Sequence, residues 1–496
     1  MKTKSTFSTV LTILSLIILV IYSCGKNSKS KEDKTYSNLE LPETNRAFLN
    51  HRDSVPSQQQ YNAPLFVLSH DYPTKVKPVV NPSWQQALKG QPISESNAFA
   101  YMDSLKSHIA PNILPFFADN KKWKAAKYGW FNEPWLGLQR EAILGAYLGN
   151  GNPANMFKTL KEDEAGYALV LYDSTAAYTL GQIWGKTGQK VNLVKDAAQF
   201  KEGSIIVKFA FSNINYPNWP VLKNAQTFNI YDTIATKENP KSGYQMRKVS
   251  FFQMDVIVKD SKTSPKTGWV FSTFVYKMNP RMDPPKDKAK RLLWDWDNMV
   301  PLGAMWGNDP AVNSPVKPPY PKLYETVINP NAPEYSKETL GWGGRLSGPN
   351  DGAVVQNAFD SSTNKKYKNL AVSSCMSCHS PAQAPLKSFV FPGNMVSVTV
   401  NKIEYDTLHI YTPGSPKWNL WFRDDYGNIP FDSGPYQVAL DYDMVTALQS
   451  IPAFDSAQKG KQNNMYNSLE QKKLVKRNVD AIKKFRLHNT KIVAKN

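Results

Sequence analysis

The sequence predicts an α+β fold, in which a helical N-terminal part and an antiparallel sheet pack against a C-terminal segment. Two kinds of apolar spacing support this fold class. In residues 94–109 the apolar side chains recur at helical spacing. In residues 203–211, 249–259 and 269–276 they alternate with a period of two, which is typical of strands. Residues 260–268 are turn-rich, so the two strands that flank them are expected to pair antiparallel.

The predicted body of the protein spans residues 39–330. Its first part, residues 39–190, is interpreted mainly as helices and loops, and a second helix is expected over residues 138–148. A proline-rich passage at residues 315–333 is a candidate boundary, because proline interrupts both helices and strands. The body is therefore expected to end near residue 330.

The strand predicted at residues 203–211 shows the alternation most clearly. One of its faces carries Ile205, Val207, Phe209 and Phe211, and the other carries Ile206, Lys208 and Ala210. Such a pattern predicts a strand whose successive side chains point to opposite sides of a sheet.

The remaining region, residues 331–496, is expected to hold a strand at residues 396–411 and a short helix at residues 441–451. Residues 469–486 combine apolar side chains at helical spacing with seven basic ones, which predicts an amphipathic helix with a basic outer face. This face is either simply solvated or a docking surface for a partner.

The most informative motif lies in this C-terminal region, where Cys375, Cys378 and His379 form a C-x-x-C-H sequence. Two thiols at this spacing add to the two vinyl groups on one edge of a porphyrin, and the histidine that follows becomes the proximal iron ligand. The motif predicts one covalently attached haem c. A redox disulfide would be expected in a thioredoxin-like βαβ setting, and a zinc site would need four ligands.

The third cysteine, Cys24, lies at the end of a predicted export signal. Lys2 and Lys4 precede an apolar run at residues 10–21, which is too short for a stable membrane span and suits a signal peptide. The segment Ile-Tyr-Ser-Cys that ends at Cys24 resembles a bacterial lipobox, whose cysteine is lipidated and becomes the mature N-terminus. An ordinary signal peptide or an uncleaved anchor is the alternative.

The predicted leader comprises residues 1–23, and the polar residues 24–38 that follow are expected to form a flexible tether. The chain should thus be exported and held by lipid at a bacterial membrane, with the outer membrane favoured and the protein facing the periplasm or the cell surface. Haem c is attached outside the bacterial cytoplasm, so this location agrees with the C-x-x-C-H motif.

The 496-residue precursor has a formal net charge of +19, and its aromatic content of 12% marks a globular chain. Such a charge favours anionic partners, namely an acidic redox protein, lipid headgroups or anionic substrates. Nucleic acid is not expected as a partner of a lipid-anchored exported protein.

The sixth ligand of the iron would decide the chemistry, because a methionine or histidine gives an electron carrier and an open position allows small molecules to bind. Met305, Met395 and Met444 are the candidates. Arg345 and Arg423 are possible partners of the haem propionates, since a guanidinium binds a carboxylate through two hydrogen bonds. Each of these residues has the simpler interpretation of core packing or surface exposure.

Several segments resemble a poorly characterised family of bacterial lipoproteins with a mono-haem cytochrome c domain. These segments are GWVFSTFVY at 268–276, LGAMWGNDP at 302–310, GWGGRLSGP at 341–349, SSCMSCHS at 373–380 and WFR at 421–423. The resemblance implies that the C-terminal region is a haem-binding, cytochrome c-like segment, and it favours Met305 as the distal ligand.

A looser similarity connects the chain with lysine-crosslinked c-type haem enzymes that oxidise hydroxylamine or nitric oxide. Those enzymes also carry C-x-x-C-H late in a β-rich chain, and the strands GSIIVK and GWVFSTF look similar. No motif identifies which lysine would form the crosslink.

Three functions follow as hypotheses. The first is a membrane-anchored cytochrome that exchanges single electrons with an exported redox partner. The second is a haem enzyme with an open distal site that acts on peroxide, hydroxylamine or nitric oxide. The third is a sensor or binding lipoprotein in which the haem is mainly structural. Glu133 and Asp309 lie among aromatic residues, but the sequence shows no pair of groups for acid–base catalysis.

Overall fold

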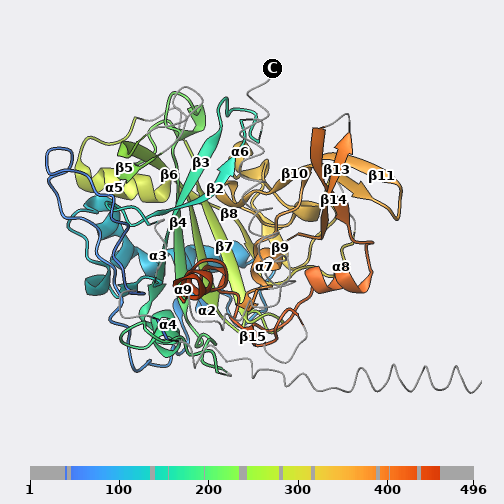
Figure 1. Cartoon of the computed structure of the whole chain (residues 1–496), viewed down its shortest axis with the longest axis horizontal. Coiled ribbons are helices and arrows are strands. Elements are labelled where there is room, and N and C mark those ends of the chain that lie inside the picture. Colours follow the sequence, from blue (N-terminus) through green and yellow to red (C-terminus); the bar gives the residue numbers. More distant parts are fainter. Residues whose placement is uncertain are drawn as a thin grey trace, which may run out of the picture.

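The computed structural model describes residues 40–41, 46–134, 140–154, 156–194, 196–233, 243–278, 283–313, 319–386, 391–400, 403–432 and 437–458 (Figure 1). The predicted leader, Cys24, the tether at residues 24–38 and the basic helix at residues 469–486 lie outside the described residues. Within them, no helix has the length and apolar character that a membrane span requires.

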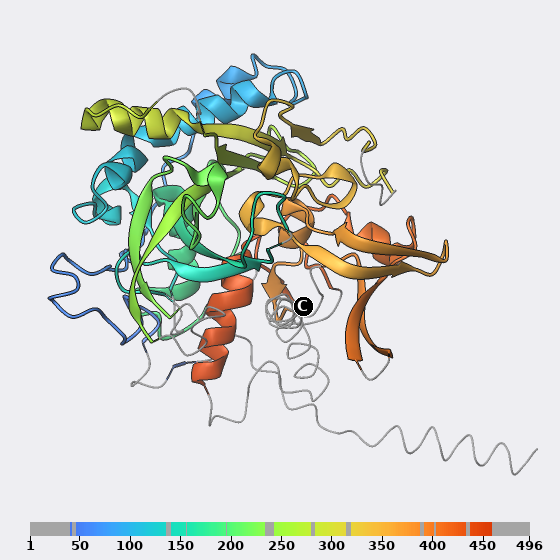
Figure 2. The ribbon, with the colours of Figure 1, turned by 90° about the horizontal axis from the view of Figure 1, so that it is seen from above.

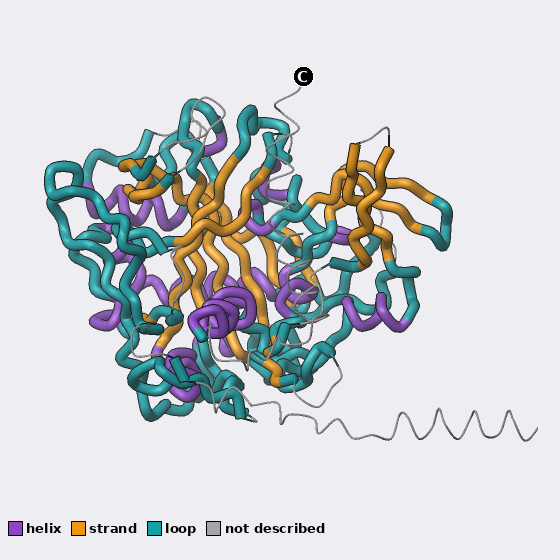
Figure 3. Tube along the Cα trace, viewed as in Figure 1, coloured by secondary structure: helices purple, strands orange, loops and turns teal. Residues whose placement is uncertain are grey.

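A nine-stranded antiparallel sheet forms the centre of the molecule (Figure 3). Its main order is β1-β3-β4-β6-β7-β8-β9, with β2 paired to β3 and β5 paired to β6. The strands are β1 (Trp130–Phe131), β2 (Tyr147–Asn152), β3 (Glu164–Asp173), β4 (Ile205–Ser212), β5 (Thr227–Asp232), β6 (Gln245–Lys259), β7 (Trp269–Tyr276), β8 (Met299–Met305) and β9 (Thr326–Ile328).

Helices cover both faces of this sheet. The α-helices are α2 (Ser83–Ala87), α3 (Ala98–Ala118), α4 (Ser174–Trp184), α5 (Lys288–Asp297), α6 (Glu334–Lys337), α7 (Cys375–His379), α8 (Pro416–Trp421) and α9 (Ile451–Ala457), the last continuing a π-helical turn η6 (Thr446–Ser450). Short 3₁₀ turns are η2 (Ala125–Tyr128), η3 (Pro220–Leu222), η4 (Trp342–Gly344) and η5 (Pro349–Asp351). Seen from above, α3 and α5 lie on one side of the sheet and α9 on the other (Figure 2).

The alternation of β4 explains how the two faces differ. Ile205, Val207 and Phe209 pack in one hydrophobic core together with α3. Ile206 packs in a second core, which includes residues of α4, α7 and α9. Because successive side chains of a strand point to opposite sides, Lys208 falls on the face of the second core. This face carries the candidate site.

A smaller sheet packs beside the body, in the order β11-β10-β14-β13, with β10 and β14 parallel. Its strands are β10 (Val354–Asp360), β11 (Lys365–Ala371), β13 (Gly393–Val400) and β14 (Ile403–Ile410), and β12 (Gln383–Ala384) pairs separately with β15 (Val438–Ala439). The chain passes from β11 to α7 in three residues, so this sheet fixes where the C-x-x-C-H helix begins.

The α+β class is confirmed, as are the helix around residues 94–109, which is part of α3, and the strands β4, β6 and β7. Residues 396–411 contain two paired strands instead of one. The helix predicted at residues 441–451 begins at Met444 and continues to Ala457. The interpretation of residues 39–190 as mainly helices and loops was wrong in one respect, because β1, β2 and β3 lie there.

The helix predicted at residues 138–148 was also wrong, since residues 142–144 form a turn and β2 begins at Tyr147. The buried carboxylate of Glu141 accepts hydrogen bonds from the backbone nitrogens of Ile143 (2.8 Å), Leu144 (2.6 Å) and Ala146 (3.2 Å). Such local bonds from side chain to backbone compete with helix formation.

The second core includes residues from both sides of the predicted boundary at residue 330. Phe271 and Leu302 of the large sheet share it with Met376 of α7 and Leu440. The division into a body and a haem-binding region stays a prediction, but the two regions do pack through common apolar contacts.

Candidate functional site

The C-x-x-C-H sequence forms the short helix α7, which packs on the second face of the large sheet (Figure 1). The helix is held at its start by the backbone, because the nitrogen of Cys375 donates to the carbonyl of Leu346 at 3.0 Å. Met376 is fully buried in the second core. The two cysteines and the histidine are thus carried on a helix whose remaining face is anchored by packing.

Both cysteines and His379 line one cavity of about 270 Å³, between α7, the sheet and the segment that leads into η6. The sheet contributes side chains of one face from four neighbouring strands: Val170 and Tyr172 of β3, Ile206 and Lys208 of β4, Asp255 and Ile257 of β6, and Phe271 and Thr273 of β7. This volume is close to the lower end of the range for small-molecule sites, about 300–1,000 Å³. We call this space the motif cavity.

The ring of His379 has a defined orientation. Its Nδ1 lies 2.8 Å from the carbonyl oxygen of Tyr442. A carbonyl only accepts hydrogen bonds, so Nδ1 carries the proton and Nε2 has a lone pair for a metal. Phe271 packs edge-on against the imidazole, with 5.0 Å between the ring centroids. Burial lowers the pKa of His379, which favours the neutral imidazole that a metal ligand requires.

The environment of the two thiols suits thioethers better than thiolates. Burial, followed by the negative charge of Asp255, raises the pKa of Cys375 well above its usual value. Burial also raises the pKa of Cys378 to about 11. Neither cysteine forms a disulfide. In the part of the chain that the structure describes, no cluster of three or more His, Cys, Asp or Glu side chains has the arrangement of a metal site. A haem bound by two neutral thioethers and one neutral imidazole fits these residues.

A charged group forms the wall of the motif cavity on the sheet. The ammonium of Lys208 pairs with Asp255 at 3.2 Å and also with Asp351. Gln253 donates to Asp255 at 2.8 Å and to Asp351 at 2.6 Å, and Thr273 donates to Asp255 at 2.7 Å. The motif cavity is therefore lined by groups that can take up or release a proton, and Gln253 and Thr273 hold them in place.

The pKa values of the two carboxyl groups differ. Burial raises the pKa of Asp255 to about 6, against the opposing effect of Lys208. Burial also acts on Asp351, but the charge and hydrogen bond of Lys208 outweigh it, so the pKa of Asp351 is lowered. The Lys208 ammonium therefore mainly stabilises the charge of Asp351.

Of the three methionines considered as distal ligands, Met444 alone lines the motif cavity. Met305 is fully buried in the second core, and its sulfur accepts a hydrogen bond from the hydroxyl of Ser374 at 3.7 Å. Met395 packs with the core of the smaller sheet. The resemblance favours Met305 and the cavity geometry favours Met444.

Neither of the two arginines considered as propionate partners lines the motif cavity. The guanidinium of Arg345 is fully buried and donates to the carbonyls of Asn308 (2.8 Å) and Asp309 (2.8 Å), among others. The guanidinium of Arg423 donates to the carbonyl of Ile429 at 3.1 Å and pairs with Asp425. Both arginines hold loops together.

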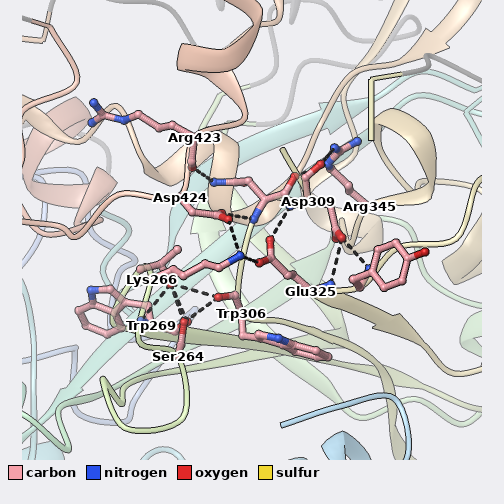
Figure 4. A network of polar contacts seen from close by, with 12 residues as sticks. Ser264, Lys266, Trp269, Trp306, Asp309, Glu325, Arg345, Arg423 and Asp424 are labelled. Atoms are coloured by element: carbon pink, nitrogen blue, oxygen red, sulfur yellow. Dashed lines mark hydrogen bonds and ion pairs between the residues drawn. The ribbon is translucent and has the colours of Figure 1, made fainter. Parts of the chain in front are cut away.

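A polar network lies between Arg345 and Arg423 (Figure 4). At its outer end the ammonium of Lys266 lies between Glu325 and Asp424, 3.5 Å from the latter. Asp424 accepts a hydrogen bond from the backbone nitrogen of Asn308 at 2.7 Å. Burial, followed by backbone hydrogen bonding in the opposite direction and the charge of Glu325, gives Asp424 a raised pKa of about 7.

Asn308 links this network to α7, the helix of the C-x-x-C-H motif. Its side-chain oxygen accepts from the hydroxyl of Ser377 at 2.7 Å, and its side-chain nitrogen donates to the carbonyl of Arg423 at 2.6 Å. Ser377 is the second variable residue of C-x-x-C-H, and both Ser377 and Asn308 are fully buried. The segment LGAMWGNDP thus supports α7 in two ways, through the apolar packing of Met305 and the hydrogen bond of Asn308 to Ser377.

Two further buried carboxyl groups meet beside the cavity. The hydroxyl of Thr446 lies 2.8 Å from Glu133 and 2.6 Å from Asp443. Tyr172 donates to Asp443 at 3.2 Å. The pKa of Glu133 is raised to about 8, first by burial and then by the charge of Asp443. The structure therefore brings Glu133 next to a second carboxyl group that the sequence did not associate with it, whereas Asp309 belongs to the network of Figure 4.

Several residues of the cavity were not identified from the sequence. Lys208 had a detectable signal, because the alternation of β4 assigns it to the face opposite the large apolar side chains. Asp255 and Thr273 lie in strands that were predicted, but their partners were not. Asp351 and the carbonyl of Tyr442 come from irregular segments, for which no periodicity exists.

Comparison with known proteins identifies no family: the chain matches no family model, no curated protein and no solved structure.

Proposed function

We propose that the protein carries one haem c in the motif cavity and exchanges single electrons with an exported redox partner. One observation carries this proposal: Cys375, Cys378 and His379 line the same cavity, and the imidazole is oriented with Nε2 as its free nitrogen. When bound, haem supplies an iron that alternates between two oxidation states.

The residues of the chain would each have a separate task. Cys375 and Cys378 form the two thioether bonds, and His379 binds the iron. The carbonyl of Tyr442 fixes the tautomer and the orientation of the imidazole, as second-shell acceptors do for metal-bound histidines. Met444 is the candidate that the cavity offers for the sixth position.

Haem attachment is tested with the full-length protein produced in a host that exports it and attaches haem c. The wild type should retain haem after denaturation and acid–acetone extraction. The double variant Cys375→Ala, Cys378→Ala should lose it entirely, while the surface variant Val80→Ala serves as a control, since Val80 is 81% exposed. Covalent haem in the double variant would refute the attachment site.

A haem enzyme with an open distal position is the second candidate function, because of the charged wall. Lys208, Asp255 and Asp351 would lie in the haem cavity, where a pure electron carrier has no need for an acid–base group. Peroxide, hydroxylamine or nitric oxide would be its substrate. Lys208 is the lysine that lines the motif cavity among the described residues, so a crosslink as in the similar enzymes would involve it.

The absorption spectrum with and without carbon monoxide separates these two functions. A low-spin spectrum that carbon monoxide leaves unchanged supports the electron carrier. A high-spin ferrous spectrum that shifts with carbon monoxide supports the enzyme. Mass spectrometry of the haem peptides shows in the same sample whether Lys208 is attached to the porphyrin. If the iron neither exchanges electrons with redox proteins nor reacts, the third hypothesis applies, a sensor or binding lipoprotein.

We also propose that lipid at Cys24 anchors the protein to the outer membrane, and that its partner is acidic. The charge of +19 and the lipobox-like sequence support this part of the proposal. Cys24→Ser should move the protein from the membrane fraction to the soluble exported fraction. Unchanged membrane association would contradict lipidation.

A further inference from the structure

A second and larger cavity adjoins the motif cavity. It measures about 680 Å³ and lies between β2, α6 and β10, which are neighbours in Figure 1. Its walls include Met156 and Leu340, together with the amide side chains of Asn152, Gln356 and Asn369. We call it the outer chamber. Its volume falls within the range of sites for small organic ligands, about 300–1,000 Å³.

The two cavities share a part of their walls, and both shared residues are glycines. Gly151 and Gly352 line the motif cavity as well as the outer chamber. Neither residue places a side chain between the two spaces. A Cβ atom at Gly352 would come within 2.6 Å of the Met156 methyl group and 2.9 Å of Thr339. Met156 and Thr339 therefore pack directly against Gly352, and any side chain at this position would crowd the shared wall.

The charges around the outer chamber are balanced. Lys337 pairs with Glu334 at 2.6 Å, and the backbone nitrogen of Lys158 donates to Glu338 at 2.7 Å. An ionic ligand would have to compete with these opposite charges. A neutral ligand meets hydrogen-bonding groups instead, since the amide side chains of Asn152, Gln356 and Asn369 line the chamber.

We propose that the outer chamber is the entry and binding site for a small, neutral, hydrogen-bonding molecule that reaches the motif cavity between Gly151 and Gly352. This inference rests on the second candidate function, the haem enzyme with an open distal position, because it assigns a route to the iron. It favours an iron with an open binding position. It also specifies the class of ligand, which neither the C-x-x-C-H motif nor the charged side chains of the motif cavity specify. Met156 forms the movable part of the passage, since its unbranched side chain adapts easily.

The test measures how fast cyanide, which is mainly neutral hydrogen cyanide near pH 7, binds to the ferric full-length haem protein. Gly352→Val narrows the shared wall, and Met156→Trp fills the outer chamber. Gly243→Val is the matched control for the first variant, because a Cβ atom at Gly243 has no atom within 4 Å. Val80→Trp is the control for the second, since Val80 is 81% exposed.

Both variants should slow cyanide association and dissociation by about tenfold or more and leave the dissociation constant nearly unchanged, because an obstructed route raises only the barrier, by about 1.4 kcal/mol for a factor of ten. The two controls should bind cyanide like the wild type. If Gly352→Val does not fold, Met156→Trp decides the question.

Unchanged association rates in folded variants would overturn the outer chamber as the route while the proposed haem function stands. Failure of the wild-type ferric haem to take up cyanide would overturn the route together with the open distal position, while the electron carrier would stand. Absence of covalent haem from the wild type is a different result, which overturns both the route and the proposed function.

Discussion

The buried carboxyl group of Glu133 should make the stability of the protein depend on pH in a way that one substitution removes. Glu133 is 2% exposed, and the hydroxyl of Thr446 joins it to Asp443. Its pKa is raised from 4.5 to about 8, first by burial and then by Asp443. The folded protein therefore keeps a proton on Glu133 at pH values where the unfolded chain has released it.

The sign and the size of this pH dependence follow from the difference between the pKa of Glu133 in the folded protein and its pKa in the unfolded chain. Below pH 4.5 the group is protonated in both states and contributes no pH dependence. Between about pH 4.5 and 8 the unfolded state binds fewer protons, so the free energy of unfolding falls by about 1.4 kcal/mol per pH unit. From pH 5.5 to 7.5 the loss from Glu133 alone is about 2.5 kcal/mol, once partial titration at both ends is included.

Glu133→Gln preserves the size of the side chain and an oxygen that accepts from Thr446, but it does not ionise. Urea unfolding of the haem protein at pH 5.5 and 7.5 should show that the variant loses about 2.5 kcal/mol less than the wild type between these values. Other buried acids, such as Glu164, titrate equally in both proteins and cancel from the comparison. Equal losses in the wild type and the variant would refute the raised pKa.

Three further predictions concern the motif cavity and the residues that support it. If Met444 is the sixth ligand, Met444→Ala should convert a low-spin spectrum into a high-spin one, whereas Met305→Leu should leave the spectrum unchanged; the opposite result would assign the ligand to Met305. Ser377→Ala and Asn308→Ala should each cost about 1–3 kcal/mol of stability, and the double variant should cost less than their sum, since they share one hydrogen bond; exact additivity in urea unfolding would contradict this coupling. Lys208→Gln leaves two carboxylates without their cation and should cost about 3–5 kcal/mol, measured in the same way.

The fold was predictable where the hydrophobic pattern was regular. The strands β4, β6 and β7 are rich in β-branched and aromatic residues with a period of two over part of their length, and the apolar period of α3 is helical, so their types followed from the sequence. The segment around Glu141 was not predictable in this way. Its apolar spacing suits a helix, but a buried carboxylate accepts hydrogen bonds from the backbone nitrogens of Ile143, Leu144 and Ala146 and stabilises a turn. Whether that carboxylate is buried depends on Tyr231, which is far away in sequence and whose nitrogen also donates to it.

In the candidate site, too, the sequence identified only those residues whose spacing along the chain is fixed by chemistry. The motif identified Cys375, Cys378 and His379 because the chemistry fixes their spacing. The opposite wall depends on tertiary contacts, since Lys208 and Asp351 are 143 residues apart in the sequence. The distance between a haem motif and its sixth ligand is not fixed by spacing either. The resemblance favoured Met305 as the sixth ligand. In the structure, however, the sulfur of Met305 contacts the hydroxyl of Ser374, and Met444 lines the motif cavity. The proposed chemistry thus depends on residues that the face of the large sheet brings to α7, and the substitutions at Met444 and Lys208 test those residues directly.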